Sequence, residues 1–359
     1  MKKALFAAVT AALLFALPLC ARAGQTPAES VAEQAGVDGL ENEFVSGEEL
    51  RGAKSVNVFE KLWQIIKLSL SGAGGFAAGF ARTLAALVFC GVMSALGGNG
   101  SAEKAWSWFS LLLLSAAAYS SVYSLCVYVT AHMESLGLAV SSFLPVSASL
   151  YALGGNPGAA AASGSALLLF STVLQTLCTR VILPLVRICF ALGLASAFPG
   201  GADVSPFAGA VKSAASAVLG FIFAMLGFAL YANTSVAAAA DGLAYRGIRF
   251  ASGAFIPVIG GSLGEASRAA IAAVSAVKGA AGAASAVAVL AAVIPPVVAA
   301  FLHRCAFSLC AAAANTLGCT AEGRFLNALS GLTGMLVALS AGAGTVCLIA
   351  IGVFVRTTV

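Results

Sequence analysis

The charged residues between positions 241 and 278 are the part of this sequence whose types and spacing are best suited to chemistry. Long apolar stretches flank this segment, and ionisable groups in such surroundings are costly and usually functional. Glu265 and Arg268 are one helical turn apart, so they can form an ion pair. The segment predicts either an element that lines a pore or substrate path, or an interfacial loop and surface helix whose charges face water. Its charged residues are Asp241, Arg246, Arg249, Glu265, Arg268 and Lys278.

No arrangement of residues in the sequence predicts covalent catalysis or a bound cofactor. We find no nucleophile paired with a base, no phosphate-binding loop and no cluster of metal ligands. Eight of the nine cysteines lie beyond residue 23, and none of them forms a C-x-x-C motif. Most lie within apolar runs, so we expect them to pack as small hydrophobic side chains. The sequence therefore predicts a protein that is not an enzyme and that needs neither cofactor nor metal.

The composition indicates which elements must hold the charged segment. Hydrophobic residues make up 60% of the 359 positions and charged residues only 9%, whereas soluble domains contain about 25% charged residues. This composition excludes an ordinary soluble enzyme, a disordered tail and a nucleic-acid-binding protein. It predicts an all-α polytopic membrane protein. The net charge of +5 is an average over unlike regions, because eight of the 14 acidic residues lie between positions 29 and 60.

Residues 1–23 have the features of a cleavable signal peptide. Two lysines precede an apolar stretch of 16 residues, and Ala21 and Ala23 supply the small side chains of a cleavage site. An uncleaved first membrane anchor is the alternative. Cleavage before Gly24 would leave the mature N-terminus outside the cytoplasm. The acidic head that follows, residues 24–56, has too few apolar residues to offset the entropy of ordering it.

The rest of the chain divides into an amphipathic helix and a membrane domain. Residues 57–72 predict a helix that lies on the membrane surface or against the protein's own loops, with Trp63 at the level of the lipid headgroups. In the membrane domain, residues 73–359, apolar stretches of about 20 residues predict six to eight transmembrane or re-entrant helices. Pro145 is expected to break one stretch and Pro295-Pro296 to interrupt another. The stretches are 77–97, 105–129, 136–154, 159–198 (two spans, or one long and one short broken helix), 213–238, 281–302 and 325–355.

A motif within the charged segment carries a family resemblance. Asp241-Gly242 and Arg246 are followed by the run Phe255-Ile256-Pro257-Val258-Ile259-Gly260 and by a helix that continues through Lys278. This order resembles the stage III sporulation protein AE family over roughly residues 58–359. Gly154-Gly155-Asn156-Pro157 is similar to a looser version of another family segment. The candidate functional positions are Asp241, Gly242, Arg246, Phe255, Pro257, Gly260, Glu265 and Arg268.

The resemblance implies a role in endospore formation. Proteins of this family are made in the mother cell and lie in the membrane that surrounds the engulfed forespore. They are similar to polytopic subunits of secretion machines, and the resemblance implies a channel, or feeding-tube, complex that sustains the forespore. The implied partners are other membrane subunits of that complex, an operon-encoded ATPase, a forespore membrane partner and the lipid bilayer, but no nucleic acid. The alternative is a stand-alone small-solute permease with broken helices, although no internal repeat supports it.

Overall fold

The structure is a computed structural model that describes residues 45, 57–71, 74–96, 101–197, 205–255 and 260–356. These residues form eight α-helices and one short π-helical segment, so the prediction of an all-α protein is confirmed for them. The predicted signal peptide and almost all of the acidic head lie outside the described residues. The elements are α4 (Val58–Ser71), α5 (Gly74–Leu96), α6 (Ser101–Leu153), α7 (Pro157–Thr176), η3 (Leu177–Ile182), α8 (Leu183–Ala197), α9 (Ser205–Phe255), α10 (Gly260–Thr316) and α11 (Thr320–Arg356).

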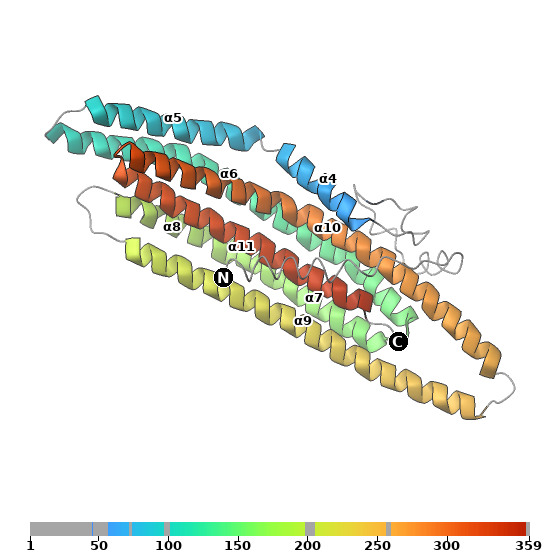
Figure 1. The fold of residues 1–359 in the computed structure, drawn as a ribbon. Helices are drawn as coiled ribbons and strands as arrows, with labels where there is room; N and C mark the ends of the chain where they lie inside the picture. Colours follow the sequence, from blue (N-terminus) through green and yellow to red (C-terminus); the bar gives the residue numbers. More distant parts are fainter. Residues whose placement is uncertain are drawn as a thin grey trace.

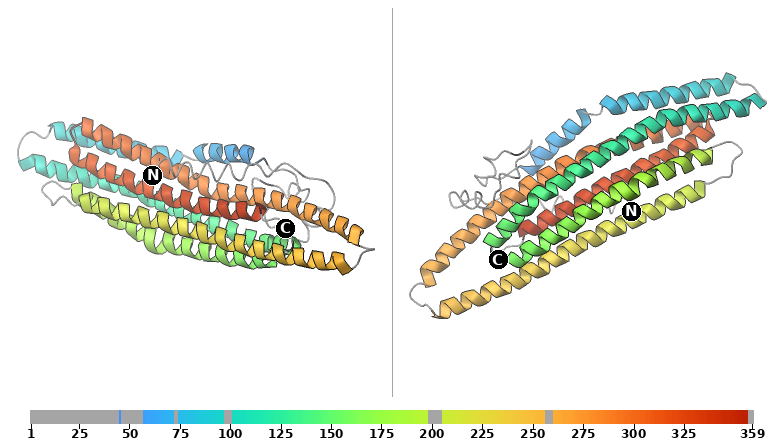
Figure 2. Two further views of the ribbon diagram at one scale, coloured as in Figure 1. Left: turned by 60° about the horizontal axis from the view of Figure 1, so that its bottom comes forward. Right: turned by 180° about the vertical axis from the view of Figure 1, so that it is seen from behind.

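The helices lie side by side along the axis of one elongated bundle (Figures 1 and 2). Short turns at residues 154–156 and 317–319 reverse the chain between α6 and α7 and between α10 and α11. α4 and α5 lie against α10 and α6 at one edge of the bundle, and α9 lies at the opposite edge. The bundle therefore has two distinct ends, and segments far apart in the sequence meet at each end.

Three of the helices are much longer than a bilayer is thick. α6, α9 and α10 have 53, 51 and 57 residues, which corresponds to about 80, 77 and 86 Å at 1.5 Å per residue. The hydrocarbon core of a bilayer measures about 30 Å. Among the described residues, five helices are long and apolar enough to cross a membrane, or six if the bent pair of α4 and α5 forms one span. The structure therefore reaches six spans, the lowest number predicted, only when α4 and α5 are counted together as one span.

Proline does not divide the long helices, which corrects two predictions. Pro145 lies inside α6, so the expected stretches 105–129 and 136–154 form one continuous helix. Pro295-Pro296 likewise lies inside α10. A proline removes one backbone donor, but neighbouring helices can hold a proline-containing membrane helix together. α6 and α10 pack against each other and against α11, so each has this support.

The stretch 159–198 is broken, as one of the two predicted arrangements requires. α7 ends at Thr176, η3 follows, and α8 adds 15 residues. Pro184 has no N–H to donate to the carbonyl group of Arg180, so the helix widens into π-helical turns just before this proline. The result is one long and one short helix.

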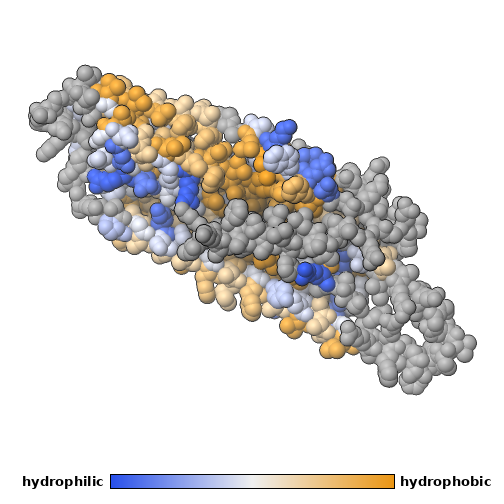
Figure 3. Space-filling model, viewed as in Figure 1, coloured by the Kyte–Doolittle hydropathy of each residue, from blue (hydrophilic) through white to orange (hydrophobic). Residues whose placement is uncertain are grey.

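α9 continues past the end predicted for it, and its outer face is apolar. The expected stretch 213–238 extends through Asp241-Gly242 as far as Phe255. Large apolar side chains recur every seven or eight residues and are at least 66% exposed, and Figure 3 shows mostly apolar colouring along this edge of the bundle. Such a stripe on one helical face suits contact with lipid. The residues are Phe221, Phe228, Val236 and Leu243.

The core of the bundle is built around α11. In its most apolar window 56% of the residues are buried, compared with 22% for α9, and α11 packs against α6, α8, α9 and α10. Small residues permit this close packing in the absence of a hydrophobic driving force in lipid. A Cβ atom on Gly344 would lie only 2.7 Å from Cγ1 of Val293 on α10. The seven cysteines whose side chains the structure describes are free, and six are buried, as expected of small apolar residues.

α4 matches the amphipathic helix predicted for residues 57–72. Its Ile65 side chain is buried, and the helix packs mainly against α10. Phe59 and Trp63 are each 65% exposed, although both are apolar. The helix is therefore present, and its place at the membrane surface stays a prediction.

Candidate functional site

The turn between α6 and α7 is the local structure around which the candidate site is built. The N–H of Gly154 donates to the carbonyl of Leu150 at 3.1 Å, and the N–H of Asn156 donates to that of Tyr151 at 2.8 Å. Gly155 has a φ of 77°, in the left-handed region that favours glycine. Pro157 then begins α7 at a position where its missing N–H costs no helical hydrogen bond. The sequence Gly-Gly-Asn-Pro thus ends one helix and begins the next.

Asp241, on α9, supplies a carboxylate to the N-terminus of α7. The backbone N–H of Ala159 donates to Oδ2 of Asp241 at 2.8 Å, whereas the side chain of Asn156 makes no capping bond to the helix. A negative charge is favourable there because the first N–H groups of a helix are unpaired and carry the positive end of its dipole. A Cβ atom on Gly158 would lie 2.7 Å from Oδ1 of Asp241. Glycine at this position therefore permits the close approach of the carboxylate.

Lys278, on α10, lies on the other side of the same turn. Its side chain is 2% exposed, and Nζ lies 4.7 Å from the ring centroid of Tyr151 and 5.7 Å from that of Phe354. A cation over desolvated aromatic faces gains about 2 kcal/mol. A Cβ atom on Gly154 would lie 3.3 Å from this nitrogen, so Lys278 packs directly against the turn. The Tyr151 and Phe354 rings meet edge to face at 5.2 Å.

The first and last charged residues of the segment predicted from the sequence, Asp241 and Lys278, therefore both contact the α6–α7 turn. Their contacts join α6 and α7 to α9, α10 and the last turn of α11. The arrangement fixes two opposite charges at one end of the bundle. It contains hydrogen-bonding and cation–π contacts but no nucleophile beside a base, so it can position helices or bind a charged group rather than perform covalent catalysis.

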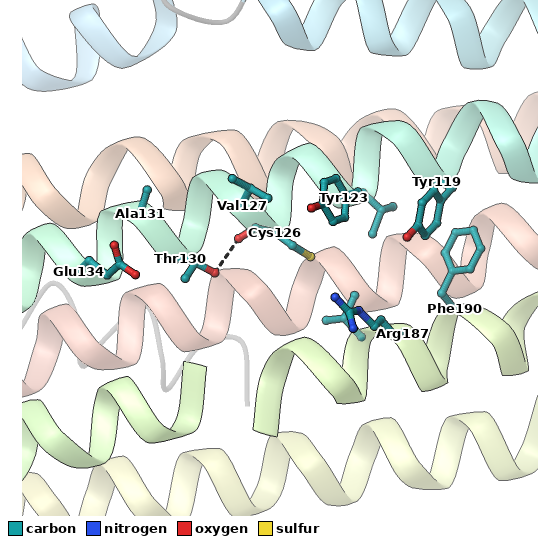
Figure 4. Close-up of a pocket in the computed structure, with 11 residues that line it drawn as sticks. Tyr119, Tyr123, Cys126, Val127, Thr130, Ala131, Glu134, Arg187 and Phe190 are labelled. Carbon is teal, nitrogen blue, oxygen red and sulfur yellow. Dashed lines mark hydrogen bonds between the residues drawn. The ribbon is translucent and has the colours of Figure 1, made fainter. Parts of the chain in front are cut away.

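A half-open pocket of about 280 Å³ lies between α6 and α8 (Figure 4). Arg187 extends from α8 toward Cys126 on α6, and Glu134 lies further along α6. The ring of Tyr119 meets that of Phe190 edge to face at 5.4 Å. Arg187 and Glu134 form no ion pair with each other, so each charge can meet a separate group of a ligand. The lining residues are Tyr119, Val122, Tyr123, Cys126, Val127, Thr130, Ala131, Glu134, Val186, Arg187 and Phe190.

A buried carboxylate lies at the end of the bundle opposite to the α6–α7 turn and Asp241. Glu322, in the first turn of α11, is 5% exposed, and the hydroxyl group of Ser110 on α6 donates to its Oε1. The start of a helix favours a carboxylate electrostatically. Burial raises the pKa of the neighbouring Cys319 thiol, and the negative charge of Glu322 raises it further. Among the described residues, no group of three or more His, Cys, Asp or Glu side chains could hold a metal ion.

The comparison with known families decides the assignment. The family model for stage III sporulation protein AE matches residues 77–358. The chain belongs to the stage III sporulation protein AE family. This confirms the resemblance drawn from the motif around residues 241–260, and it makes the chain a membrane protein involved in stage III of sporulation. No curated protein and no solved structure matches the chain.

The structure places the candidate motif of the sequence analysis on two helices that extend beyond the α6–α7 turn (Figure 1). Asp241 and Gly242 lie where α9 passes this turn, and Gly242 is half-buried. Arg246 and Phe255 follow on α9, and Gly260, Glu265 and Arg268 lie at the start of α10. The side chains of Arg246, Phe255, Glu265 and Arg268, and all of Pro257, lie outside the described part of the structure. The pairing of Glu265 with Arg268 therefore stays a prediction.

Two functional candidates in this family member were missed by sequence reasoning. Glu322 is the single acidic residue between Lys278 and the C-terminus, and an isolated carboxylate in an apolar region was itself a usable signal. Arg187 lies within the apolar stretch 159–198, and the sequence indicates no role for it. Its partners in the pocket come from α6, more than 50 residues earlier in the sequence, so spacing alone gave no indication of the pocket.

Proposed function

We propose that the chain is a non-enzymatic integral membrane subunit of the channel complex that links mother cell and forespore and sustains forespore development. The family match over residues 77–358 is the observation that carries this proposal. Family membership implies membership of the stage III sporulation complex to which these proteins belong. The further partners are an operon-encoded ATPase and a protein of the forespore membrane.

The lengths of the helices support a role as a subunit. A helix of about 80 Å extends beyond the bilayer, whose total thickness including headgroups is about 45 Å, even when it is tilted by 40°. The ends of α6, α9 and α10 are therefore available to other proteins outside the lipid. The segments of α9 and α10 that carry the family motif extend beyond the α6–α7 turn, where a partner can reach both helices.

We also propose that the signal peptide, residues 1–23, is removed, and that the acidic head of residues 24–56 lies outside the cytoplasm. This arrangement places the protein in the mother-cell membrane around the forespore with its mature N-terminus between the two membranes. Mass spectrometry of the purified protein should detect an N-terminal peptide that begins at Gly24. An Ala23→Leu variant should retain the leader, because a bulky residue blocks the cleavage site. A mature wild-type chain that still begins at Met1 would establish the uncleaved anchor instead.

The proposed function is tested by deleting the gene and restoring it. The deletion strain should complete engulfment and then arrest, and wild-type protein expressed in the mother cell should restore spore yield. Expression in the forespore alone should not restore it. Normal spore formation by the deletion strain would overturn the proposal.

The charged segment has its own test. If Glu265 pairs with Arg268 within the assembled complex, Glu265→Ala should lower spore yield more than Glu103→Ala does. The membrane level of each variant, measured by immunoblot, separates a loss of function from a loss of protein. Equal and negligible effects would assign residues 241–278 to a solvated helix surface.

A permease that acts alone is the second candidate, because the pocket between α6 and α8 combines a cation, a carboxylate and aromatic rings. Uptake of a small solute by the purified protein in liposomes, abolished by Arg187→Gln, would favour this function. An inactive purified protein, together with restored spore yield only when the other subunits are present, would favour the channel subunit.

A further inference from the structure

Two cations from different helices, Lys212 and Arg304, lie against a notch in α11 that is formed by Gly331 and Gly334. The proposed function assigns no role to these residues. The ammonium group of Lys212, on α9, lies directly against Gly331. The guanidinium group of Arg304, on α10, lies against Gly334, with Nη1 3.0 Å from the position that a Cβ atom would occupy. Gly331 and Gly334 are one turn apart on α11, so they share one face of the helix. The absence of side chains at both positions gives the two cations access to the α11 backbone.

The two positive charges are close together in apolar surroundings. Residues one turn apart have Cβ positions separated by about 6 Å, which places the two cationic groups within about 11 Å of each other. Both side chains are half-buried, and all three helices are candidate membrane spans. No carboxylate among the residues that the structure describes pairs with either cation. Like charges at this separation repel in a medium of low dielectric constant, so the notch favours an anion between them.

The surroundings of the notch indicate the kind of anion. The hydroxyl group of Ser330 donates to the carbonyl of Arg304 at 3.2 Å, and the Ser308 hydroxyl oxygen lies 2.9 Å from that of Ser330. The helix segments that carry the two cations also expose large apolar side chains, since Phe207 on α9 is 62% exposed and Phe301, one turn before Arg304 on α10, is 55% exposed. Figure 3 shows hydrophilic residues beside apolar ones toward the end of the bundle at which α9 begins. A ligand with a charged head and an apolar body matches this pattern.

We propose that Lys212 and Arg304 form a binding site for a phosphate group. A guanidinium group binds phosphate oxygens through two parallel hydrogen bonds, and a lysine ammonium adds a second charge. The phosphate can belong to the headgroup of an anionic phospholipid or be free in solution. The exposed Phe207 and Phe301 side chains suit the lipid, whose acyl chains would lie against them.

The test uses the full chain in nanodiscs of phosphatidylcholine with and without phosphatidylglycerol. Phosphatidylglycerol should raise the thermal midpoint of the wild type, because a ligand that binds only the folded state stabilises it. The double variant Lys212→Gln/Arg304→Gln should lose this rise and bind the lipid at least about tenfold more weakly, which corresponds to the loss of one charge-assisted hydrogen bond or more. Arg324→Gln is the matched control, since it removes an exposed cation from the same end of α11. Its response should equal that of the wild type.

A Gly331→Ala variant keeps both cations, and it distinguishes a loss of ligand binding from a loss of protein stability. A methyl group there collides with the Lys212 ammonium, and the flexible lysine must move away. The thermal midpoint without phosphatidylglycerol should stay at or above the wild-type value, because alanine favours helix, whereas the response to phosphatidylglycerol should fall. In detergent, stabilisation by inorganic phosphate that the double variant loses would identify free phosphate as the ligand. A double variant that responds to phosphatidylglycerol and to phosphate as the wild type does would overturn the proposal.

Discussion

The carboxylate of Asp241 caps α7 by accepting a hydrogen bond from the backbone N–H of Ala159, which lies 82 residues earlier in the chain. Most helix caps are supplied by the residue just before the helix. Here Asn156 occupies that position without capping, and its amide instead donates to the carbonyl of Gly154 at 3.3 Å. The start of α7 is therefore stabilised by tertiary structure, and α7 and α9 depend on each other for correct placement.

Asp241→Ala should destabilise the bundle by about 1 kcal/mol, the usual cost of removing a capping side chain. Asp241→Asn should cost less, because an amide oxygen still accepts the hydrogen bond while the charge is lost. Thermal unfolding of the purified protein measures both changes. Glu134→Ala, which removes an exposed acid from the middle of α6, is the control and should unfold as the wild type does. Equal thermal midpoints for all four proteins would show that the Asp241 contact contributes nothing.

Gly158→Ala should also be destabilising, although alanine is a better helix former than glycine by about 1 kcal/mol. Its methyl group would lie 2.7 Å from Oδ1 of Asp241 and displace the carboxylate. In the Asp241→Ala background the same substitution should become neutral or stabilising, because the obstruction is gone. Gly220→Ala, on an open face of α9, should be stabilising in both backgrounds. A Gly158→Ala effect that does not depend on residue 241 would contradict this explanation.

A double-mutant cycle between Lys278 and Tyr151 should give a coupling free energy of about 1–2 kcal/mol, as expected for a desolvated cation–π contact. The cycle combines Lys278→Met with Tyr151→Leu, two changes that keep much of the buried volume. The effect of Lys278→Met alone on the free energy of unfolding has no fixed sign, because replacing a buried charge by an apolar side chain also removes the desolvation cost of that charge. The coupling term is therefore the quantity to measure, by chemical or thermal unfolding. A coupling of zero would mean that the ammonium group only packs against the ring.

The alkylation of Cys319 should begin at a lower pH in Glu322→Gln than in the wild type. Burial and the Glu322 charge both raise the pKa of this thiol, and only the thiolate reacts. Removing the negative charge lowers the pKa, so the thiolate fraction at a given pH increases. Mass spectrometry of the peptide that contains Cys319, after iodoacetamide treatment across a pH series, gives the midpoint. Glu60→Gln should leave this midpoint unchanged, and an equally unchanged midpoint in Glu322→Gln would show that burial alone sets the pKa.

Much of the architecture was accessible from the sequence because apolar length and family resemblance are local signals. The all-α fold and the helix at residues 57–72 follow from composition and spacing, and a broken helix within residues 159–198 was one of the two arrangements predicted for that stretch. The continuity of α6 and α10 did not follow, because Pro145 and Pro295-Pro296 are normally helix-breaking and only packing against neighbouring helices holds these helices intact.

The geometry of the candidate site was not predictable from the sequence. The concentration of charge between Asp241 and Lys278 indicated a segment of interest, and its functional role stays a prediction. The contact of Asp241 with Ala159 and the position of Lys278 over Tyr151 could not be predicted, because both contacts join helices that are distant along the chain. The contact of Glu322 with Ser110 and that of Lys212 with Gly331 also join helices that are distant along the chain.

The dependence of the core on α11 has a consequence for the biogenesis of the protein. α11 follows α6, α8, α9 and α10 in the chain, and it packs against all four of them. Until residues 320–356 enter the membrane, the helices that surround them have no common partner, and the small residues that α11 covers face lipid. The bundle must therefore remain open until α11 has been synthesised. A chain that is truncated before α11 lacks this core, so we expect membrane quality-control proteases to recognise it as unfolded and degrade it.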